Sequence, residues 1–193
     1  VDTQGRGVDS ITATGVRAQG FEYELDCLIY ASGFEVGTDY SRRADIQLLG
    51  CGGNTLTEKW SSGVRTLHGM HVNGFPNCFI MSNAQAGFTA NYPHLLDEQA
   101  KHIAYIIETA GAKGCSRVEV TEQGEAGWVQ RCIDRARDTG DFLENCTPGY
   151  YNNEGRTGDR NAQNGFYGGG SIEFFRLLGE WRAAGGLEGL ALR

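Results

Sequence analysis

The chain has 193 residues, of which 40% are hydrophobic and 21% are charged. This is a globular composition with enough apolar material for the core of one domain, or of one and a half. The net charge of −7 argues against nucleic acid as a partner, because phosphate binding needs clustered Lys and Arg. No apolar run is long enough to cross a membrane and no signal peptide opens the chain, so we expect a cytoplasmic protein.

Glycine and cysteine usage add two expectations. The 29 glycines predict many tight turns and close backbone approaches. The six cysteines are scattered without a C-x-x-C pair, which predicts buried free thiols in a reducing compartment. His68 and His71 are three residues apart, but the sequence shows no third ligand beside them, so we expect no metal site.

The N-terminal segment predicts a β-hairpin, with strands over residues 11–16 and 21–30 around a turn at Gln19-Gly20. The second strand becomes apolar on both faces, so we expect it to enter the interior of a sheet and to end at Gly33. A glycine there lets the backbone approach a flat cofactor or another chain segment closely. An ordinary glycine turn after a buried strand is the structural alternative.

Residues 35–75 are expected to be rich in loops, and the apolar run at 77–82 predicts a buried strand. A helix is predicted over residues 91–110, capped by Thr89 or Asn91 and ended by Gly111. The N–H groups at its start would favour an electron-rich ligand atom, such as the edge of a flavin. One apolar face of this helix would carry Tyr92, Leu96, Ala100, Ile103, Ile107 and Ala110.

Two further helices are predicted, over residues 122–137 and from Ser171 to a stop at Gly185, followed by a loose tail. The long loop between them contains Tyr150 and Tyr151. These tyrosines either line a pocket for substrate or nicotinamide, or anchor a surface loop. The chain has no dinucleotide fingerprint, nucleophile elbow or Ser–His–Asp pattern, so no catalytic residue is assigned.

The order of several motifs is more specific than any one of them. Residues 26–34 read Asp-Cys-Leu-Ile-Tyr-Ala-Ser-Gly-Phe, residues 74–77 read Gly-Phe-Pro-Asn, and residues 91–99 read Asn-Tyr-Pro-His-Leu-Leu-Asp-Glu-Gln. Together with Gly50-Cys-Gly-Gly53 they resemble the C-terminal half of flavin-dependent Baeyer–Villiger monooxygenases, in the flavin-containing monooxygenase superfamily. The sequence departs from the family at Ser82-Asn83, where the family usually has Gly-Pro.

The resemblance implies an α/β fold, the C-terminal part of a two-domain FAD/NAD(P)-binding Rossmann-like fold with a β-hairpin, a buried strand and three helices. Residues 1–40 would be the tail of the NADP-binding domain, and residues 41–111 the returning part of the FAD-binding domain. Residues 112–193 would form a C-terminal segment of helices and loops. Because the chain begins at Val1 without Met, we expect a missing N-terminal portion with the nucleotide fingerprints and the catalytic arginine.

The implied function is an FAD- and NADPH-dependent monooxygenase that inserts oxygen into ketones to give esters or lactones, inactive as this chain alone. The expected partners are the ketone, the missing portion and, through exposed apolar residues at 28–31, a second copy. The residues implied in cofactor binding are Gly33, Asn91 and Tyr92. Those implied in substrate binding are Gly87, Phe88, Thr89, Tyr150 and Tyr151.

Two other functions remain open. One is a flavin monooxygenase that oxidises nitrogen or sulfur atoms, although the segment 118–155 favours the ketone branch. The other is a non-catalytic remnant or interaction module that keeps the scaffold without the cofactors. Flavin absorbance in a purified sample would distinguish an enzyme from a module.

Overall fold

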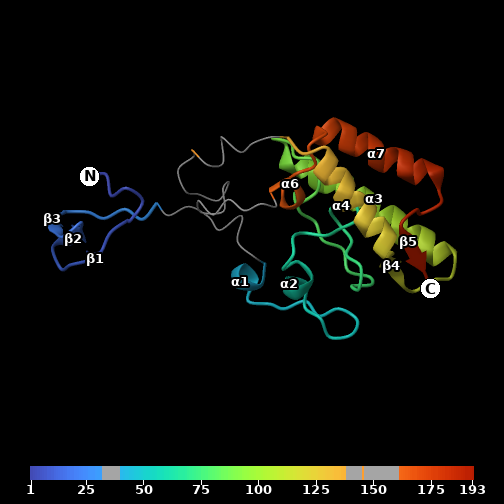
Figure 1. Cartoon of the computed structure of the whole chain (residues 1–193), viewed down its shortest axis with the longest axis horizontal. Helices are drawn as coiled ribbons and strands as arrows, with labels where there is room; N and C mark the ends of the chain where they lie inside the picture. Colours follow the sequence, from blue (N-terminus) through green and yellow to red (C-terminus); the bar gives the residue numbers. More distant parts are fainter. Residues whose placement is uncertain (32–39, 138–144, 146–160) are drawn as a thin grey trace. The chain divides into compact units, whose positions relative to one another are not determined.

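A computed structural model describes residues 1–31, 40–137, 145 and 161–193 of the chain. The chain divides into two compact units, drawn in Figure 1. The first comprises residues 1–39 with 139–157, and the second residues 40–138 with 158–193. Each unit is described by itself. The domain boundaries expected from the resemblance stay a prediction, as do Gly33, Tyr150 and Tyr151, which lie outside the described residues.

The first unit contains a small antiparallel sheet of β1 (Ser10–Ile11), β2 (Gly15–Ala18) and β3 (Phe21–Glu24), in that order. Ala18 pairs with Phe21, so Gln19 and Gly20 form the two-residue loop. Both loop residues have left-handed φ values, 53° and 81°. Such loops match the twist of the strands that they join, and the predicted hairpin turn is confirmed.

The predicted lengths of these strands are wrong. Residues 12–14 turn between β1 and β2, and β3 ends at Glu24 instead of continuing to residue 30. The reason is pairing: β2 begins at Gly15 opposite Glu24, and the last bond joins Leu25 N to Thr14 O. Without a partner strand the apolar run cannot stay in a ladder, and Ile29 and Tyr30 are 81% and 74% exposed.

The helices described next lie in the second unit. The three long ones, α3 (Tyr92–Ala112), α4 (Glu122–Asp134) and α7 (Gly170–Ala184), confirm the predicted helices with small shifts at their ends. Gly111 lies inside α3 and does not end it, whereas Gly185 ends α7 with φ 70° as predicted. Within the described ranges, three short helices lie in segments predicted as loops: α1 (Tyr40–Ala44), α2 (Leu56–Lys59) and α6 (Asn161–Asn164).

The buried face of α3 differs from the predicted one. Ile107 is 54% and Tyr92 39% exposed, although both were expected on the apolar face. Because neighbouring residues of a helix lie about 100° apart, the buried stripe is shifted by about one position. It includes two polar side chains, which hydrophobic periodicity could not assign to the core. Its members are Leu95, Gln99, His102, Ile106 and Ala110.

The predicted buried strand at 77–82 is not a strand. Ile80 N donates to Met70 O, and Asn77 N donates to Val118 O. These single bonds go to two different segments and make no ladder. The prediction rested on the apolar run alone, which does not show whether a partner strand is present. Met81 at its end is 44% exposed.

The C-terminal tail is ordered, contrary to the prediction of a loose end. β5 (Leu190–Leu192) pairs antiparallel with β4 (Val118–Val120), with Val118 opposite Leu192. Leu187 is buried at 3% exposure and packs with Ile106 of α3. The pairing partner lies about 70 residues away in sequence, so no local pattern indicated it.

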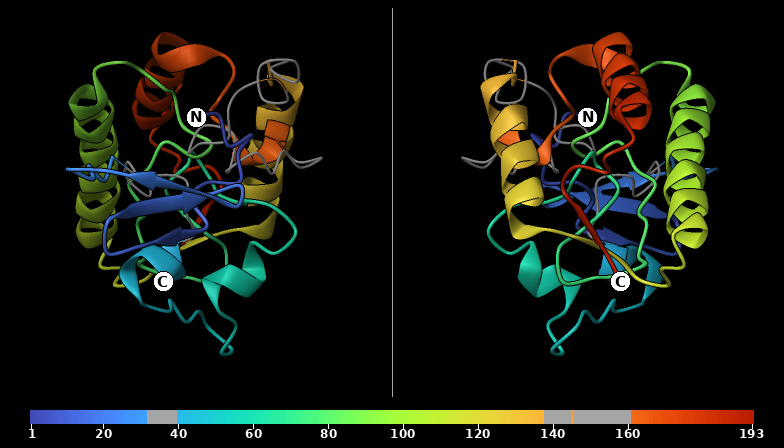
Figure 2. Two further views of the ribbon diagram at one scale, coloured as in Figure 1. Left: turned by 90° about the vertical axis from the view of Figure 1, so that its left-hand side faces the viewer. Right: turned by 90° about the vertical axis from the view of Figure 1, so that its right-hand side faces the viewer.

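Irregular segments complete the core of the second unit. Figure 2 shows them running between α3 and α4, with α7 nearby. Leu67, Met70 and Ala86 from these segments pack with Leu95 of α3 and Phe174 of α7 in one buried cluster. The described residues are therefore a mixed α/β arrangement in which turns, rather than a continuous sheet, lie between the long helices.

Two sequence-based expectations can be compared with the side chains directly. The five cysteines in the described ranges are free thiols as expected, but only Cys132 is fully buried, and Cys27 and Cys51 are exposed. Burial raises the pKa of Cys132 to about 12, so its thiol is held in the unreactive protonated form. No helix in the part of the chain that the structure describes is long and apolar enough to cross a membrane.

Candidate functional site

The turn formed by residues 82–91 leads into α3 and contains most of the predicted site. Gly87, Phe88 and Thr89 lie in this turn, and Asn91 and Tyr92 follow at the start of the helix. The structure thus presents five of the eight predicted residues as one continuous segment. Their predicted roles toward cofactor and substrate are not tested by this geometry alone.

Gly87 is required by packing against α7. A Cβ atom at this position would lie 2.6 Å from Cβ of Phe174 and 2.9 Å from Cα of Ser171. Both distances are shorter than side chains tolerate, so any larger residue would push the helix away from the turn. Glycine here lets α7 approach the 82–91 turn.

Phe88 forms an exposed aromatic pair with Phe166. The two rings stack with centroids 4.4 Å apart and planes 22° apart. Phe88 is 45% and Phe166 40% exposed, so the stacked rings are only partly covered by other side chains. The pair therefore offers a flat apolar surface beside the turn. Phe166 was not predicted, because nothing in the sequence links it to residue 88.

The N-terminus of α3 is capped by its own residues. Asn91 Oδ1 accepts from His94 N at 3.3 Å, and Thr89 Oγ1 accepts from Asn91 N at 3.2 Å. Pro93 has no N–H to offer. The terminus therefore has fewer free donors for a ligand than an uncapped helix would, although Asn91 and Tyr92 themselves are exposed.

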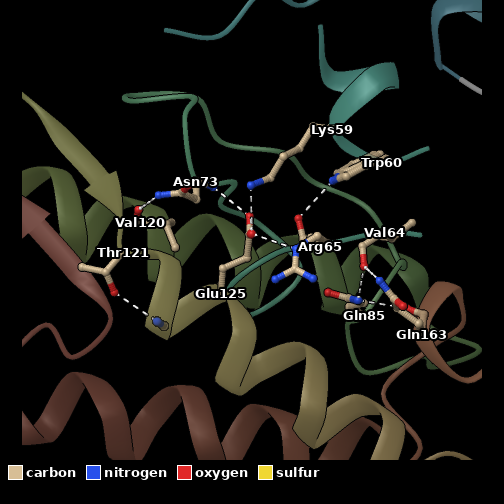
Figure 3. A network of polar contacts seen from close by, with 11 residues as sticks. Lys59, Trp60, Val64, Arg65, Asn73, Gln85, Val120, Thr121, Glu125 and Gln163 are labelled. Carbon is tan, nitrogen blue, oxygen red and sulfur yellow. Dashed lines mark hydrogen bonds and ion pairs between the residues drawn. The ribbon is translucent and has the colours of Figure 1, made fainter. Parts of the chain in front are cut away.

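A buried carboxylate, Glu125, organises the polar contacts shown in Figure 3. Its side chain is fully buried in the first turns of α4. Oε2 accepts from Arg65 Nε at 3.1 Å and pairs with Lys59 Nζ at 3.1 Å. Oε1 accepts from the backbone N of Asn73 at 2.9 Å. We call these four residues the Glu125 network; in it a buried charge has the ionic and hydrogen-bonded partners that burial demands.

Three buried histidines form a second group, the histidine cluster: His68, His71 and His102. Nδ1 of His68 lies 3.3 Å from Nε2 of His102. The ring of His68 also packs edge-on against Trp128 and Trp181, at centroid distances of 4.9 and 5.5 Å. The sequence had paired His68 only with His71, because His102 lies on a different element.

Burial keeps these imidazoles neutral. Desolvation lowers the pKa of His68 to about 3, of His71 to about 4 and of His102 to about 2. Among the described residues, His71 Nε2 and His102 Nδ1 have no hydrogen-bond partner, and neither do Gln99 Oε1 and Arg182 Nη1. No group of three or more His, Cys, Asp or Glu side chains within the described ranges is arranged to hold a metal ion.

A shallow cavity lies apart from the 82–91 turn. It has a volume of about 310 Å³ and lies between residues 48–51 and 75–78, with Cys51 and Cys78 in its lining. Arg117 Nη2 donates to Cys51 Sγ at 3.4 Å. None of the predicted site residues lines this cavity, so it contributes nothing to the predicted site.

The whole chain is similar to known monooxygenases, although no family model matches it. A pentalenolactone D synthase of Streptomyces arenae is 50% identical over 195 residues, covering all of this chain and 33% of the relative. A Baeyer–Villiger monooxygenase of Streptomyces coelicolor is 40% identical over 184 residues, covering 94% of this chain and 30% of the relative.

A solved structure extends this similarity to the fold. The polycyclic ketone monooxygenase of Thermothelomyces thermophila matches with a TM-score of 0.84 and 34% identity, covering all of this chain and 32% of that one. The present chain thus spans about a third of the length of the proteins that it matches. The chain is homologous to the Baeyer–Villiger monooxygenases, flavin enzymes that use FAD and NADP, over about a third of their length.

Proposed function

We propose that this chain forms part of an FAD- and NADPH-dependent monooxygenase that inserts an oxygen atom into ketones to give esters or lactones. One observation carries the proposal: similarity to Baeyer–Villiger monooxygenases runs over the entire chain, at 50% identity to a pentalenolactone D synthase. The chain would be the C-terminal portion of a two-domain Rossmann-like fold. It would be inactive without the remaining portion, which would carry the nucleotide fingerprints.

The residues of this chain could contact one edge of a flavin, but they do not make up a complete nucleotide-binding site. No fingerprint for a pyrophosphate occurs in the chain, so its phosphates would be bound elsewhere. Exposed Asn91 and Tyr92 would border the flavin, with Gly33 near the junction of the two domains. The flavin, when bound, carries electrons from the nicotinamide to dioxygen, and the protein supplies orientation.

The substrate would lie against the turn before α3. Phe88, stacked on Phe166, provides an apolar surface that suits the hydrocarbon body of a ketone. Gly87 and Thr89 would border the same pocket, and the resemblance to the family adds Tyr150 and Tyr151 as further proposed substrate-binding residues.

Activity of the complete enzyme tests this proposal. The protein that contains this chain, with its upstream residues, should bind FAD and consume NADPH faster when a cyclic ketone is added. Mass spectrometry should find the product one oxygen atom heavier than the ketone. Oxidation of amines or sulfides in place of ketones would support the neighbouring branch, and a colourless protein without flavin would support an interaction module.

Association of the isolated chain gives a second measurement. Ile29 and Tyr30 are exposed apolar residues of the first unit, and we propose that they are covered by the remaining portion or by a second copy. Analytical ultracentrifugation of the isolated chain should show self-association that decreases when the upstream portion is added. A single monomeric species at all concentrations would contradict this.

A further inference from the structure

Gln85 in the 82–91 turn makes more connections to distant segments than its place in a turn suggests. The residue is completely buried and has a left-handed φ of 54°. Its Oε1 accepts from Thr66 Oγ1 at 2.6 Å, and its Nε2 donates to the carbonyl oxygens of Val64 and Gln163 at 2.8 and 2.9 Å. Figure 3 shows the Gln85 side chain beside Val64 and Gln163, with a dashed line to each.

The backbone of Gln85 is held by two more segments. Its N–H donates to Gly165 O at 2.8 Å, and its carbonyl accepts from Trp128 Nε1 at 3.2 Å. One residue later, Tyr167 N donates to Ala86 O at 2.9 Å. The turn is thus joined to residues 64–66, to residues 163–167 and to α4. A buried amide with all these bonds fixes the segments relative to one another, because each lost bond would leave a buried polar atom unpaired.

The opposite side of the turn is closed by backbone. Gly69 has φ 73°, and a Cβ atom there would lie 2.8 Å from Ala84 O. With Gly87 packed against α7, the turn is confined on both sides of Gln85. Displacing Gln85 would therefore shift Gly87 and Phe88, whereas Asn91 stays anchored as the cap of α3 by its bond with His94 N.

We propose that Gln85 is a positioning residue, which sets where Phe88 and Asn91 lie relative to each other and to Phe166. This inference rests on the proposed function, because it assigns to Gln85 the alignment of the ketone with the flavin. Oxygen insertion depends on that alignment, whereas transfer of electrons from NADPH to the flavin does not involve the ketone. Misalignment would let NADPH, a proton and dioxygen react to NADP⁺ and hydrogen peroxide, with the ketone left unchanged.

The test uses the complete enzyme with Gln85→Met, which keeps the side-chain volume and removes all three of its hydrogen bonds. Flavin content and the rate of flavin reduction by NADPH should stay within about twofold of wild type. The fraction of NADPH that yields oxygenated product should fall about tenfold, with hydrogen peroxide accounting for the rest. Gln85→Asn keeps an amide and should recover part of this coupling. Gln130→Met is the matched control, because the exposed Gln130 amide contacts only Asp134 one turn away among the bonds described.

The outcomes separate this inference from the function on which it rests. Wild-type enzyme without ketone oxygenation would overturn the proposed function. An active wild type with unchanged coupling in Gln85→Met would overturn the positioning role alone. If both Gln85 variants lost flavin content and coupling to the same extent, Gln85 would be a purely structural residue. That result would also overturn the positioning role. If Gln85→Met does not fold, the coupling ratio of Gln85→Asn decides, with a fall supporting the proposal and wild-type coupling overturning it.

Discussion

The Glu125 network and the histidine cluster are both buried polar groups in the second unit, but they treat their polar atoms differently. The Glu125 carboxylate receives Arg65, Lys59 and a backbone N–H within 3.1 Å. In the histidine cluster, His71 Nε2 and His102 Nδ1 have no partner among the described residues. The first group therefore stabilises a charge inside the protein, whereas the second is stable only while its rings stay uncharged.

Acid should destabilise the histidine cluster, and this is the largest effect that we expect. The folded pKa values of the histidines, about 3, 4 and 2, lie below the ordinary 6.5, so the unfolded chain binds more protons below that pH. Their stabilisation is present above pH 6.5 and is lost as the pH falls toward the folded values. Acidification from neutral pH to about pH 5 should remove about 4–6 kcal/mol of the free energy of unfolding, at about 1.4 kcal/mol per unit for each group.

The measurement is denaturant unfolding between neutral and acidic pH. His102→Gln should lower the number of protons taken up on unfolding by about one, and so flatten the pH dependence. His94→Gln, on the exposed side of α3, is the control and should leave the slope as it is. A pH dependence that is the same in both variants would show that the cluster does not govern acid stability.

Removing the charge of Glu125 should lower the free energy of unfolding by less than this acidification does. Glu125→Gln keeps the shape of the side chain but leaves Lys59 and Arg65 without their buried counter-ion, which should lower the free energy of unfolding by about 3 kcal/mol. Glu180→Gln, in the exposed pair with Arg176, should change it by less than about 0.5 kcal/mol. Urea unfolding of the two variants measures both. Equal effects would mean that Glu125 is not held as the structure has it.

The face of α3 that carries His102 can be tested by neighbouring residues. Ile106 is completely buried and Ile107 is 54% exposed. Ile106→Ala should therefore destabilise the chain by about 2–3 kcal/mol, because a cavity remains, and Ile107→Ala by less than about 0.5 kcal/mol. Thermal unfolding of the two variants measures this difference. If the face predicted by periodicity were the buried one, Ile107→Ala would be the more destabilising of the two.

The smallest expected effect concerns the exposed start of the same helix. Asn91→Asp keeps a good helix cap but adds a negative charge where the proposed flavin edge becomes electron-rich, and should slow flavin reduction about threefold in the complete enzyme. Asn91→Ser keeps the cap without the charge and should reduce at the wild-type rate. Stopped-flow absorbance follows both. Identical rates in the Asp variant would remove Asn91 from the proposed cofactor contacts.

Some features were predictable because their causes are local. The Gln19-Gly20 turn, the Asn91 cap of α3 and the Gly185 stop of α7 each depend on residues within a few positions of one another. The similarity to Baeyer–Villiger monooxygenases was also predictable, because the order of several motifs in the sequence resembles theirs. The long helices followed from apolar spacing, although the buried face of α3 did not.

The tertiary structure alone decided what lies beside what. Three kinds of contact join distant residues: the pairing of β5 with β4, the contact of His102 with His68, and the bonds of Gln85 to Thr66 and Gln163. The residues in these contacts are 19 to 78 positions apart in the sequence. Hydrophobic periodicity assigns polar residues to the surface, so it could not place Gln85, Gln99, His102 or Glu125 in the core. A polar side chain becomes favourable inside a protein only when its partners are brought to it, and those partners come from distant parts of the chain.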